Sequence, residues 1–239
     1  MSGHSKWAQI KRQKGAADQK KGQLFSKLAR EIAIAAKGGG DPEMNFKLRM
    51  VMDKARAVAM PNENIQRAIR RGTGEEGGGT IEEIVYEGYG PFGTAFLIEA
   101  ATDNKNRTVN NIKHIFSKHG GNLGSAGSVA WQFVTRGQIL VERAGGPDLA
   151  DIELAAIDAG AEDVKESNEG LEIYTIPLGL TAVKHKVIAA GGKVARAEVI
   201  KESTQGTYLT DEQKPAVDAL FAELENDEDV IAVHTSANL

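Results

Sequence analysis

The sequence of 239 residues contains no cysteine. This absence excludes a disulfide framework, a thiolate nucleophile, a cysteine-ligated zinc ion and an iron–sulfur cluster, and it is typical of a reducing compartment. Long apolar runs are also absent, since none approaches the roughly 18 residues that a membrane span needs. The polar, lysine-bearing start Met1–Lys14 lacks the apolar centre of a signal peptide. We therefore expect a cytoplasmic protein that has no membrane partner.

Recognisable catalytic motifs are missing as well. No two of the five histidines have the i, i+4 helical spacing with a nearby acid that a zinc protease needs, and Gly124–Ser128 does not match the G-x-S-x-G pattern of the common serine hydrolases. The carboxylates are spread along predicted helices and strand edges and single out no acid–base pair. The sequence predicts no catalytic site, no metal site and no cofactor, so we expect that the chain is not an enzyme.

The net charge of −4 conceals an uneven distribution along the chain. Residues 1–71 contain 16 Lys and Arg against 6 Asp and Glu, a net charge of +10, whereas residues 72–239 contain 13 against 27, a net charge of −14. Such asymmetry indicates that the N-terminal segment meets an anion. The alternative is a solvated basic helical surface, although ordinary surfaces interleave both signs more evenly.

The basic segment divides into an arm and a helical bundle. Residues 1–23 have almost no large apolar side chain beyond Trp7 and Ile10, so this arm cannot build a core of its own. Residues 24–72 contain three stretches of helical periodicity and predict a three-helix bundle. For the second of these helices, Asp41 is the predicted N-cap and Pro42 the first helical residue.

A glycine-rich linker at residues 73–79 precedes two predicted α+β domains. Residues 80–135 with 206–239 form a discontinuous α+β domain, whose predicted elements are strands at 81–87, 94–101, 128–134 and 230–235 and helices at 107–119 and 210–225. The last helix begins with a capping box, Thr210-x-x-Gln213. Residues 136–205 have the order β-α-β-β-α-β, which is that of a ferredoxin-like unit. The predicted fold class is therefore multi-domain α+β: an N-terminal three-helix bundle and two α+β domains, the ferredoxin-like one inserted in the other.

The glycine-rich segment Gly120–Ser128 has three interpretations. Successive glycines let backbone N–H groups approach an anion, as in phosphate-binding loops. The segment nevertheless lacks the Gly-Lys-Ser/Thr ending of such loops and leads into a predicted strand instead of a helix. We therefore favour a structural helix-to-strand loop over nucleotide binding, with contact to a macromolecular partner as the third alternative.

Lysine and arginine side chains on a reachable surface suffice for contacts to nucleic-acid phosphates, which supply affinity without reading base sequence. Trp7 can stack on an unpaired base or pin the arm to the bundle. The helix dipole alone also favours the arginines that end the third helix. The predicted nucleic-acid-binding residues are Lys6, Trp7, Lys11, Arg12, Lys14, Lys20, Lys21, Lys47, Arg49, Lys54, Arg56, Arg67, Arg70 and Arg71, with Lys105 and Arg107 as two further candidate contacts.

Four motifs in the same order resemble the YebC/PmpR family, which includes the mitochondrial translational activator of cytochrome c oxidase. They are MSGHSKW at residues 1–7, GYGP at 88–91, NRT at 106–108, and GNLGS at 121–125 with GSVAW at 127–131. The resemblance covers essentially the whole chain. One departure is Phe92, which stands in a position that the family often fills with glycine.

The resemblance implies a three-domain, cytoplasmic, non-enzymatic protein, described as a probable DNA-binding transcriptional regulator. It also implies an alternative function, a ribosome- or RNA-associated translation factor that contacts ribosomal RNA or tRNA and relieves stalled translation. A basic arm with one aromatic residue suits irregular RNA, and the sequence shows no DNA-reading dimer element. A third hypothesis is a protein-interaction module, in which the acidic ferredoxin-like domain binds a protein partner and the basic bundle binds the acidic surface of another copy of the chain.

Overall fold

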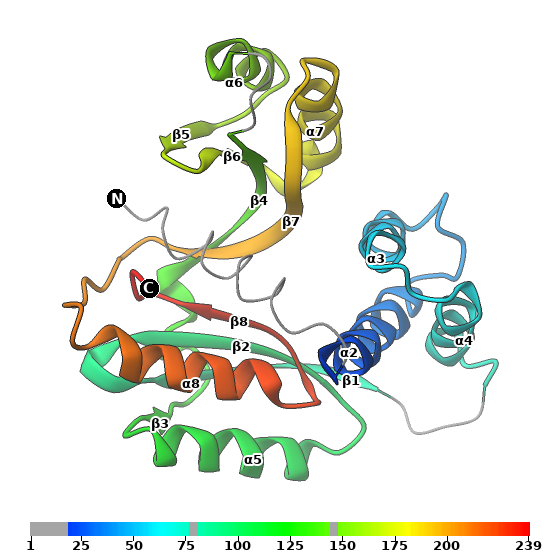
Figure 1. Cartoon of the computed structure of the whole chain (residues 1–239). Helices are drawn as coiled ribbons and strands as arrows, with labels where there is room; N and C mark the ends of the chain where they lie inside the picture. The colour runs from blue at the N-terminus through cyan, green and yellow to red at the C-terminus, as the bar shows by residue number, and fades with distance from the viewer. Residues whose placement is uncertain (1–18, 77–80, 144–147) are drawn as a thin grey trace. The chain divides into compact units, whose positions relative to one another are not determined.

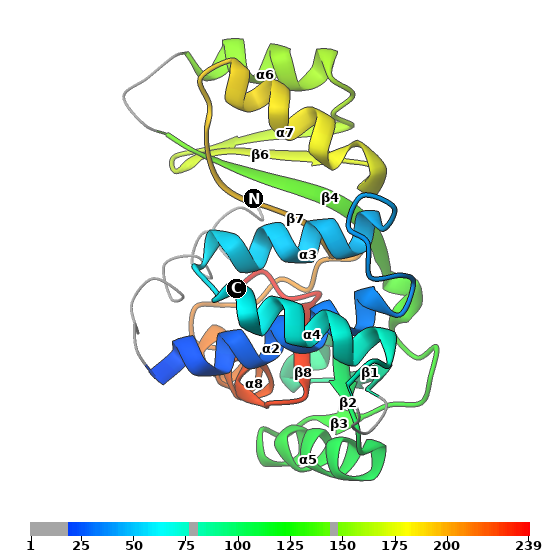
Figure 2. The ribbon, with the colours of Figure 1, turned by 90° about the vertical axis from the view of Figure 1, so that its right-hand side faces the viewer.

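The computed structural model describes residues 19–76, 81–143 and 148–239. They form two compact units: a larger unit with the described residues between 19 and 130 and between 209 and 237, and a smaller unit with those between 131 and 208 and residues 238–239. Within these ranges the chain forms seven α-helices and two four-stranded antiparallel sheets (Figures 1 and 2). The predicted multi-domain α+β fold class is confirmed.

The larger unit begins with three helices: α2 (Gln19–Ala36), α3 (Phe46–Ala57) and α4 (Asn62–Thr73). Their apolar stripes meet in one buried core, which includes Leu28, Ile32, Leu48, Met52, Ile65 and Ile69. Helices α2 and α4 approach so closely that a Cβ at Gly72 would lie 2.2 Å from the carbonyl oxygen of Ala33. Only glycine fits this contact. The predicted three-helix bundle is confirmed.

The start of α3 differs from the prediction that Asp41 is the N-cap. The side-chain oxygen of Asn45 accepts a hydrogen bond from the Leu48 N–H at 3.0 Å, so Asn45 caps the helix. Its amide nitrogen also donates to the carbonyls of Ala35 and Gly39. Asparagine has both a donor and an acceptor, so one side chain caps α3 and fixes the connection from α2. Asp41 instead accepts a hydrogen bond within the preceding turn.

The rest of the larger unit is a sheet with the strand order β3-β1-β2-β8, formed by β1 (Glu82–Tyr89), β2 (Ala95–Thr102), β3 (Asn122–Leu123) and β8 (Val230–Thr235). Two helices, α5 (Lys105–Lys118) and α8 (Lys214–Asn226), pack against it (Figure 1). The ring of Phe96 on β2 meets that of Phe116 on α5 edge to face, with centroids 5.9 Å apart. Ala101, on the opposite face of β2, packs with Ala33 and Ile34 of α2. Strand β2 is therefore buried on both faces, which accounts for its nearly continuous apolar sequence.

The predicted strand at 128–134 is wrong. Residues 130–132 form a short 3₁₀ helix, and β4 (Phe133–Glu142) begins after it. The backbone N–H groups of Val129 and Ala130 donate to the carboxylate of Glu87 at 2.7 Å. They are therefore not available to the hydrogen-bond ladder of a sheet.

The start of α8 also differs from the predicted capping box. The Gln213 side chain does accept a hydrogen bond from the Thr210 N–H at 3.1 Å, but these residues form a turn and the helix begins at Lys214. Pro215 explains this start, because proline favours the first positions of a helix.

The smaller unit contains β4, α6 (Leu149–Asp158), β5 (Asp163–Ser167), β6 (Gly170–Thr175), α7 (Leu180–Ala189) and β7 (Lys193–Ser203), with a 3₁₀ turn at Pro177–Gly179. Its strand order is β5-β6-β4-β7, and all pairs are antiparallel. Both helices lie on the same face of the sheet (Figure 2). Element order and sheet order are those of the predicted ferredoxin-like unit, which interrupts the larger unit in sequence.

The finer domain boundaries stay a prediction: the arm at 1–23, the bundle at 24–72, the linker at 73–79, and the division of the two α+β domains at 135/136 and 205/206. Residues 1–18 of the arm and 77–79 of the linker lie outside the described residues. Among the described residues, no helix is both long and apolar enough to cross a membrane.

Phe92 adopts a backbone conformation that favours glycine. It lies in the 3₁₀ turn Pro91–Gly93 with φ 61° and ψ 23°, which is the left-handed region. We expect Phe92→Gly to be more stable than Phe92→Ala by about 1 kcal/mol, because only the glycine variant removes the clash between Cβ and the backbone. Both variants remove the same ring, so alanine is the matched control. Thermal unfolding of the two variants measures the difference, and equal stability would show that the turn is unstrained.

Candidate nucleic-acid interface

Helix α3 carries four of the predicted contact residues along its two edges. Lys47 and Lys54 lie two turns apart on one edge, and Arg49 and Arg56 lie two turns apart on the other. Each side chain is between 43% and 63% exposed. The buried face of α3 points into the bundle core, so both rows of cations border the outer surface of the helix.

Helix α4 carries three arginines on its outer face. Arg67, Arg70 and Arg71 lie opposite to the buried residues Ile65 and Ile69. The structure thus brings together seven predicted residues on two consecutive helices of the bundle (Figure 2).

Each of these seven cations forms an ion pair with a carboxylate. The N–O distances are 3.3 Å for Lys47–Glu83, 3.5 Å for Arg49–Glu43, 3.0 Å for Lys54–Glu31, 3.3 Å for Arg56–Asp53, 3.2 Å for Arg67–Glu63, 3.1 Å for Arg70–Glu76 and 3.7 Å for Arg71–Asp103. Exposed ion pairs contribute only about 0–1 kcal/mol each. A phosphate can therefore replace the carboxylate partner of such a cation at little cost.

The ion pairs do not remove the positive excess of the bundle. Residues 19–73 contain 12 Lys and Arg against 5 Asp and Glu, a net charge of +7. A surface with this excess attracts a polyanion over a distance of about 10 Å at 0.1 M salt.

The arm residues Lys6, Trp7, Lys11, Arg12 and Lys14 lie outside the described residues, as does the side chain of Lys20. Lys21 is exposed at the start of α2, and its ammonium lies 5.7 Å from the centre of the Phe25 ring. The role of these residues stays a prediction.

The further candidates Lys105 and Arg107 lie at the start of α5, away from α3 and α4 in sequence, and both have partners. The Lys105 ammonium is 2.6 Å from Glu82. The Arg107 guanidinium binds the carboxylate of Asp229 with N–O distances of 2.9 and 3.1 Å, and also pairs with Asp103 at 3.3 Å. The side chain of Asp229 is only 3% exposed. Arg107 therefore has a structural role, and its contact to phosphate stays a prediction.

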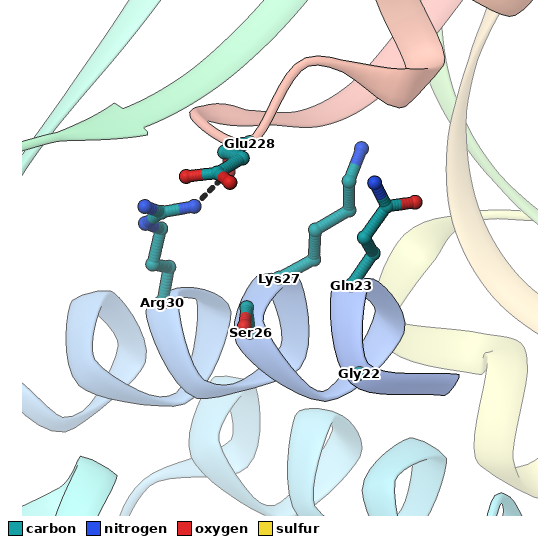
Figure 3. A pocket seen from close by; sticks show the side chains of 6 residues that line it. All are labelled: Gly22, Gln23, Ser26, Lys27, Arg30 and Glu228. Atoms are coloured by element: carbon teal, nitrogen blue, oxygen red, sulfur yellow. Dashed lines mark hydrogen bonds between the residues drawn. The ribbon is translucent and has the colours of Figure 1, made fainter. Parts of the chain in front are cut away.

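Two further cations, Lys27 and Arg30 of α2, are not among the predicted contact residues. Both project toward the turn between α8 and β8, where they border a cavity of about 340 Å³ together with Gln23 and Glu228 (Figure 3). Lys27 donates to the carbonyl of Glu225, and Arg30 donates to that of Glu228.

Burial lowers the pKa of the Lys27 ammonium, although the negative charges of Glu225 and Asp227 oppose this shift. Arg30 also lies 3.3 Å from a carboxylate oxygen of Asp229. These two cations therefore join the bundle to the sheet of the same unit. The i, i+3 spacing of Lys27 and Arg30 predicts that they share one face of α2. The sequence does not show that the acidic turn between α8 and β8 packs on this face.

The end of the glycine-rich segment and the two residues after it donate backbone hydrogen bonds to a carboxylate of the protein itself. One carboxylate oxygen of Glu87 accepts from the Gly127 N–H at 2.6 Å, and the other accepts from Val129 and Ala130 at 2.7 Å. Glu87 is 7% exposed. Burial raises the pKa of its carboxyl, but the three N–H donors outweigh burial and hold this pKa below its ordinary value of 4.5. These backbone N–H groups resemble those of a phosphate-binding loop, but they bind the carboxylate of Glu87. This supports the interpretation of Gly120–Ser128 as a structural loop.

We expect Glu87→Gln to destabilise the larger unit by about 2 kcal/mol at neutral pH, because the amide NH₂ faces a backbone donor and the charge is lost. The Glu87 carboxyl has a lower pKa in the folded protein than in the unfolded chain, so the carboxylate stabilises the fold at pH values above its unfolded-state pKa. This stabilisation is lost as the pH falls through the folded-state pKa. The difference in unfolding free energy between the wild type and Glu87→Gln should therefore shrink below pH 4.5.

Calorimetric unfolding at several pH values measures this difference. The matched control is Glu82→Gln, an exposed position on the same strand, which should change stability little. A difference between wild type and Glu87→Gln that persists unchanged in acid would contradict the assigned role of the carboxylate.

Among the described residues, no group of three or more His, Cys, Asp or Glu side chains is arranged to hold a metal ion. The His119 imidazole instead lies 2.6 Å from a carboxylate oxygen of Glu223, which the Lys118 ammonium also contacts at 2.8 Å. These contacts, that of Lys118 first, lower the pKa of the Glu223 carboxyl.

Comparisons with known proteins account for almost the whole chain. A family model described as the TACO1/YebC protein N-terminal domain matches residues 5–75. A second model, described as the TACO1/YebC second and third domain, matches residues 81–237.

Similar curated proteins cover the full length. A probable transcriptional regulatory protein of Moorella thermoacetica is 51% identical and is matched over 100% of this chain and 96% of its own length. A protein of the same description from Thermoanaerobacter pseudethanolicus is 49% identical over 100% of this chain and 98% of its own length. Among solved structures, a conserved hypothetical protein from Aquifex aeolicus superposes with a TM-score of 0.82, is 39% identical, and covers 92% of this chain and 91% of its own.

Proposed function

The chain belongs to the TACO1/YebC family, and from this premise we propose that it is a regulatory protein that binds DNA through its basic arm and helical bundle. The family membership agrees with the resemblance drawn from the four sequence motifs. Relatives that are about half identical over their full length carry the name of probable transcriptional regulatory proteins, which supports a regulatory role in place of an enzymatic one.

The observation that carries the proposal is the excess of cations on the outer surfaces of α3 and α4. Phosphate contacts need exposed Lys and Arg side chains whose present partners are easily replaced. The seven cations on these helices meet both conditions, because each is at least 39% exposed and each forms an exposed or partly exposed ion pair. The acidic remainder of the chain limits the contact to this region.

Duplex DNA is the target that agrees with the description of the relatives as probable transcriptional regulatory proteins. Exposed cations on α3 and α4 suit contacts to the phosphates of a duplex, which position a protein on DNA without reading its base sequence.

A second candidate function, RNA binding by a ribosome-associated translation factor, is favoured by the sequence of the arm. Trp7 stands among Lys6, Lys11 and Arg12. An aromatic ring among cations suits unpaired bases, which are the usual target of sequence-dependent RNA recognition.

Cross-linking in cells, followed by sequencing of the attached nucleic acid, separates the two candidates. The proposal predicts that DNA is attached and that promoter regions are enriched. Recovery of ribosomal RNA or tRNA, together with cosedimentation with ribosomes at moderate salt, would replace it by the second candidate. Recovery of no nucleic acid would overturn both and leave protein-only binding, which survives nuclease treatment.

A further inference from the structure

The two helices of the smaller unit expose apolar side chains on neighbouring surfaces. Helices α6 and α7 lie side by side on one face of the sheet (Figures 1 and 2). Leu154 and Ile157 of α6 are 60% and 51% exposed, and Ile188 of α7 is 49% exposed. Leu178, in the turn before α7, is 78% exposed. Large apolar side chains grouped on adjacent helices are typical of a surface that another protein covers.

The same two helices carry opposite charge. Helix α6 and its N-cap contain Asp148, Asp151, Glu153 and Asp158 and no basic residue. Helix α7 contains Lys184, His185 and Lys186 and no acidic residue. A partner that covers both helices must therefore present a basic apolar surface to α6 and an acidic apolar surface to α7.

A second copy of this chain can supply both surfaces, because it carries a basic helix, α7, and an acidic helix, α6. In an interface with two-fold symmetry, the contact of one residue with another is repeated with the two copies exchanged. If α6 of each copy lies against α7 of the other, acidic and basic helices meet twice. Pairing of α6 with α6 would instead oppose like charges.

We propose that the α6–α7 face is a homodimer interface in which α6 of one copy packs against α7 of the other. The interface buries Leu154, Ile157 and Ile188 at its centre and pairs the charges of the two helices at its rim. The dimer places two basic bundles in one particle, which raises the effective concentration of the second bundle once the first has bound a polyanion.

Two charge-swapped proteins test the proposal with the full chain. The first carries Asp151→Lys and Asp158→Lys on α6, and the second carries Lys184→Glu and Lys186→Glu on α7. In each protein alone, like charges meet across the interface, so we expect the dimer dissociation constant to rise at least about tenfold. In an equal mixture, the lysines of the first protein face the glutamates of the second, and their remaining α7 and α6 helices are native. The mixture should therefore form a heterodimer with nearly wild-type affinity.

Analytical ultracentrifugation from micromolar to about millimolar concentration measures these affinities. A matched control carries Arg143→Glu and Lys201→Glu, two reversals on the same unit away from both helices, and should associate as the wild type does. A wild-type chain that stays monomeric throughout would overturn the proposal in favour of a different protein partner. Unchanged association of either swapped protein, or no recovery on mixing, would overturn the arrangement of α6 against α7. Because no nucleic acid is present, the result does not depend on the proposed function.

Discussion

Asp229→Asn is expected to reduce the hydrogen-exchange protection of the amides in β2 and β8 by about 10²- to 10³-fold. The buried carboxylate holds two guanidinium groups, those of Arg107 at 2.9 Å and Arg30 at 3.3 Å, and accepts the Thr108 hydroxyl at 2.7 Å. Removal of one partner from a buried ion pair costs about 3–5 kcal/mol. The cost here lies toward the lower end of that range, because the Arg107 and Arg30 side chains are 49% and 21% exposed and water can compensate part of their charge. Protection of amides in the sheet reports this loss directly and locates it in the larger unit.

The control for this substitution is Glu228→Gln, the neighbouring position, where the side chain is exposed and Arg30 uses only the backbone carbonyl. The same charge is lost, and protection should stay within a factor of a few. Burial raises the pKa of the Asp229 carboxyl, but hydrogen bonds from Arg107 and Thr108 and the charge of Arg30 lower it overall. Its stabilisation is therefore complete above the ordinary pKa of 3.8 and is lost as the pH falls through the folded-state pKa. Equal protection in both variants would show that Asp229 does not hold the bundle to the sheet.

Replacement of Arg67, Arg70 and Arg71 by glutamine is expected to weaken binding to duplex DNA by about 10²-fold at 0.15 M salt. Each phosphate contact releases counterions and contributes about 0.9 to the slope of log K against log salt. The loss of three contacts should therefore reduce the magnitude of that slope by nearly three. The fold should persist, because all three side chains are at least 39% exposed and their ion pairs contribute little.

A variant with the same charge change elsewhere distinguishes this contact from a general electrostatic effect. Replacement of Lys113, Arg143 and Lys201 by glutamine removes three cations outside the bundle. Fluorescence anisotropy titrations at four or more salt concentrations should show the native slope for this control. Equal losses in both variants would mean that only net charge matters and that α4 has no special part in binding.

Much of the fold was predictable because its signals are local. Periodic apolar residues set the bundle helices, and the order of strands and helices set the ferredoxin-like unit. Two of the errors lie where a side chain forms hydrogen bonds with the backbone outside its own helix or strand. Asn45 takes the cap assigned to Asp41 because its amide also binds the end of α2. The predicted strand at 128–134 is wrong because Glu87, about forty residues earlier, takes the N–H groups that a strand needs.

The candidate site was predictable in composition but not in pairing. Helical spacing placed the cations of α3 and α4 on outer surfaces, and the structure agrees. The same rule does not distinguish Lys27 and Arg30, which face an acidic turn from the other end of the chain. Nor does it predict that Arg107 binds a buried carboxylate 122 residues away. Long-range ion pairs leave no periodic trace in a sequence, so only the structure separates structural cations from available ones.

Identification of the protein residues that cross-link to nucleic acid locates the binding surface directly. Ultraviolet cross-linking of the purified full chain to duplex DNA and to RNA, followed by peptide mass spectrometry, gives this map. We expect cross-linked peptides from the arm and from α3 and α4, within residues 1–73, for whichever nucleic acid binds more tightly. Cross-links confined to residues 81–237, or none at a salt concentration where binding is measurable, would contradict it.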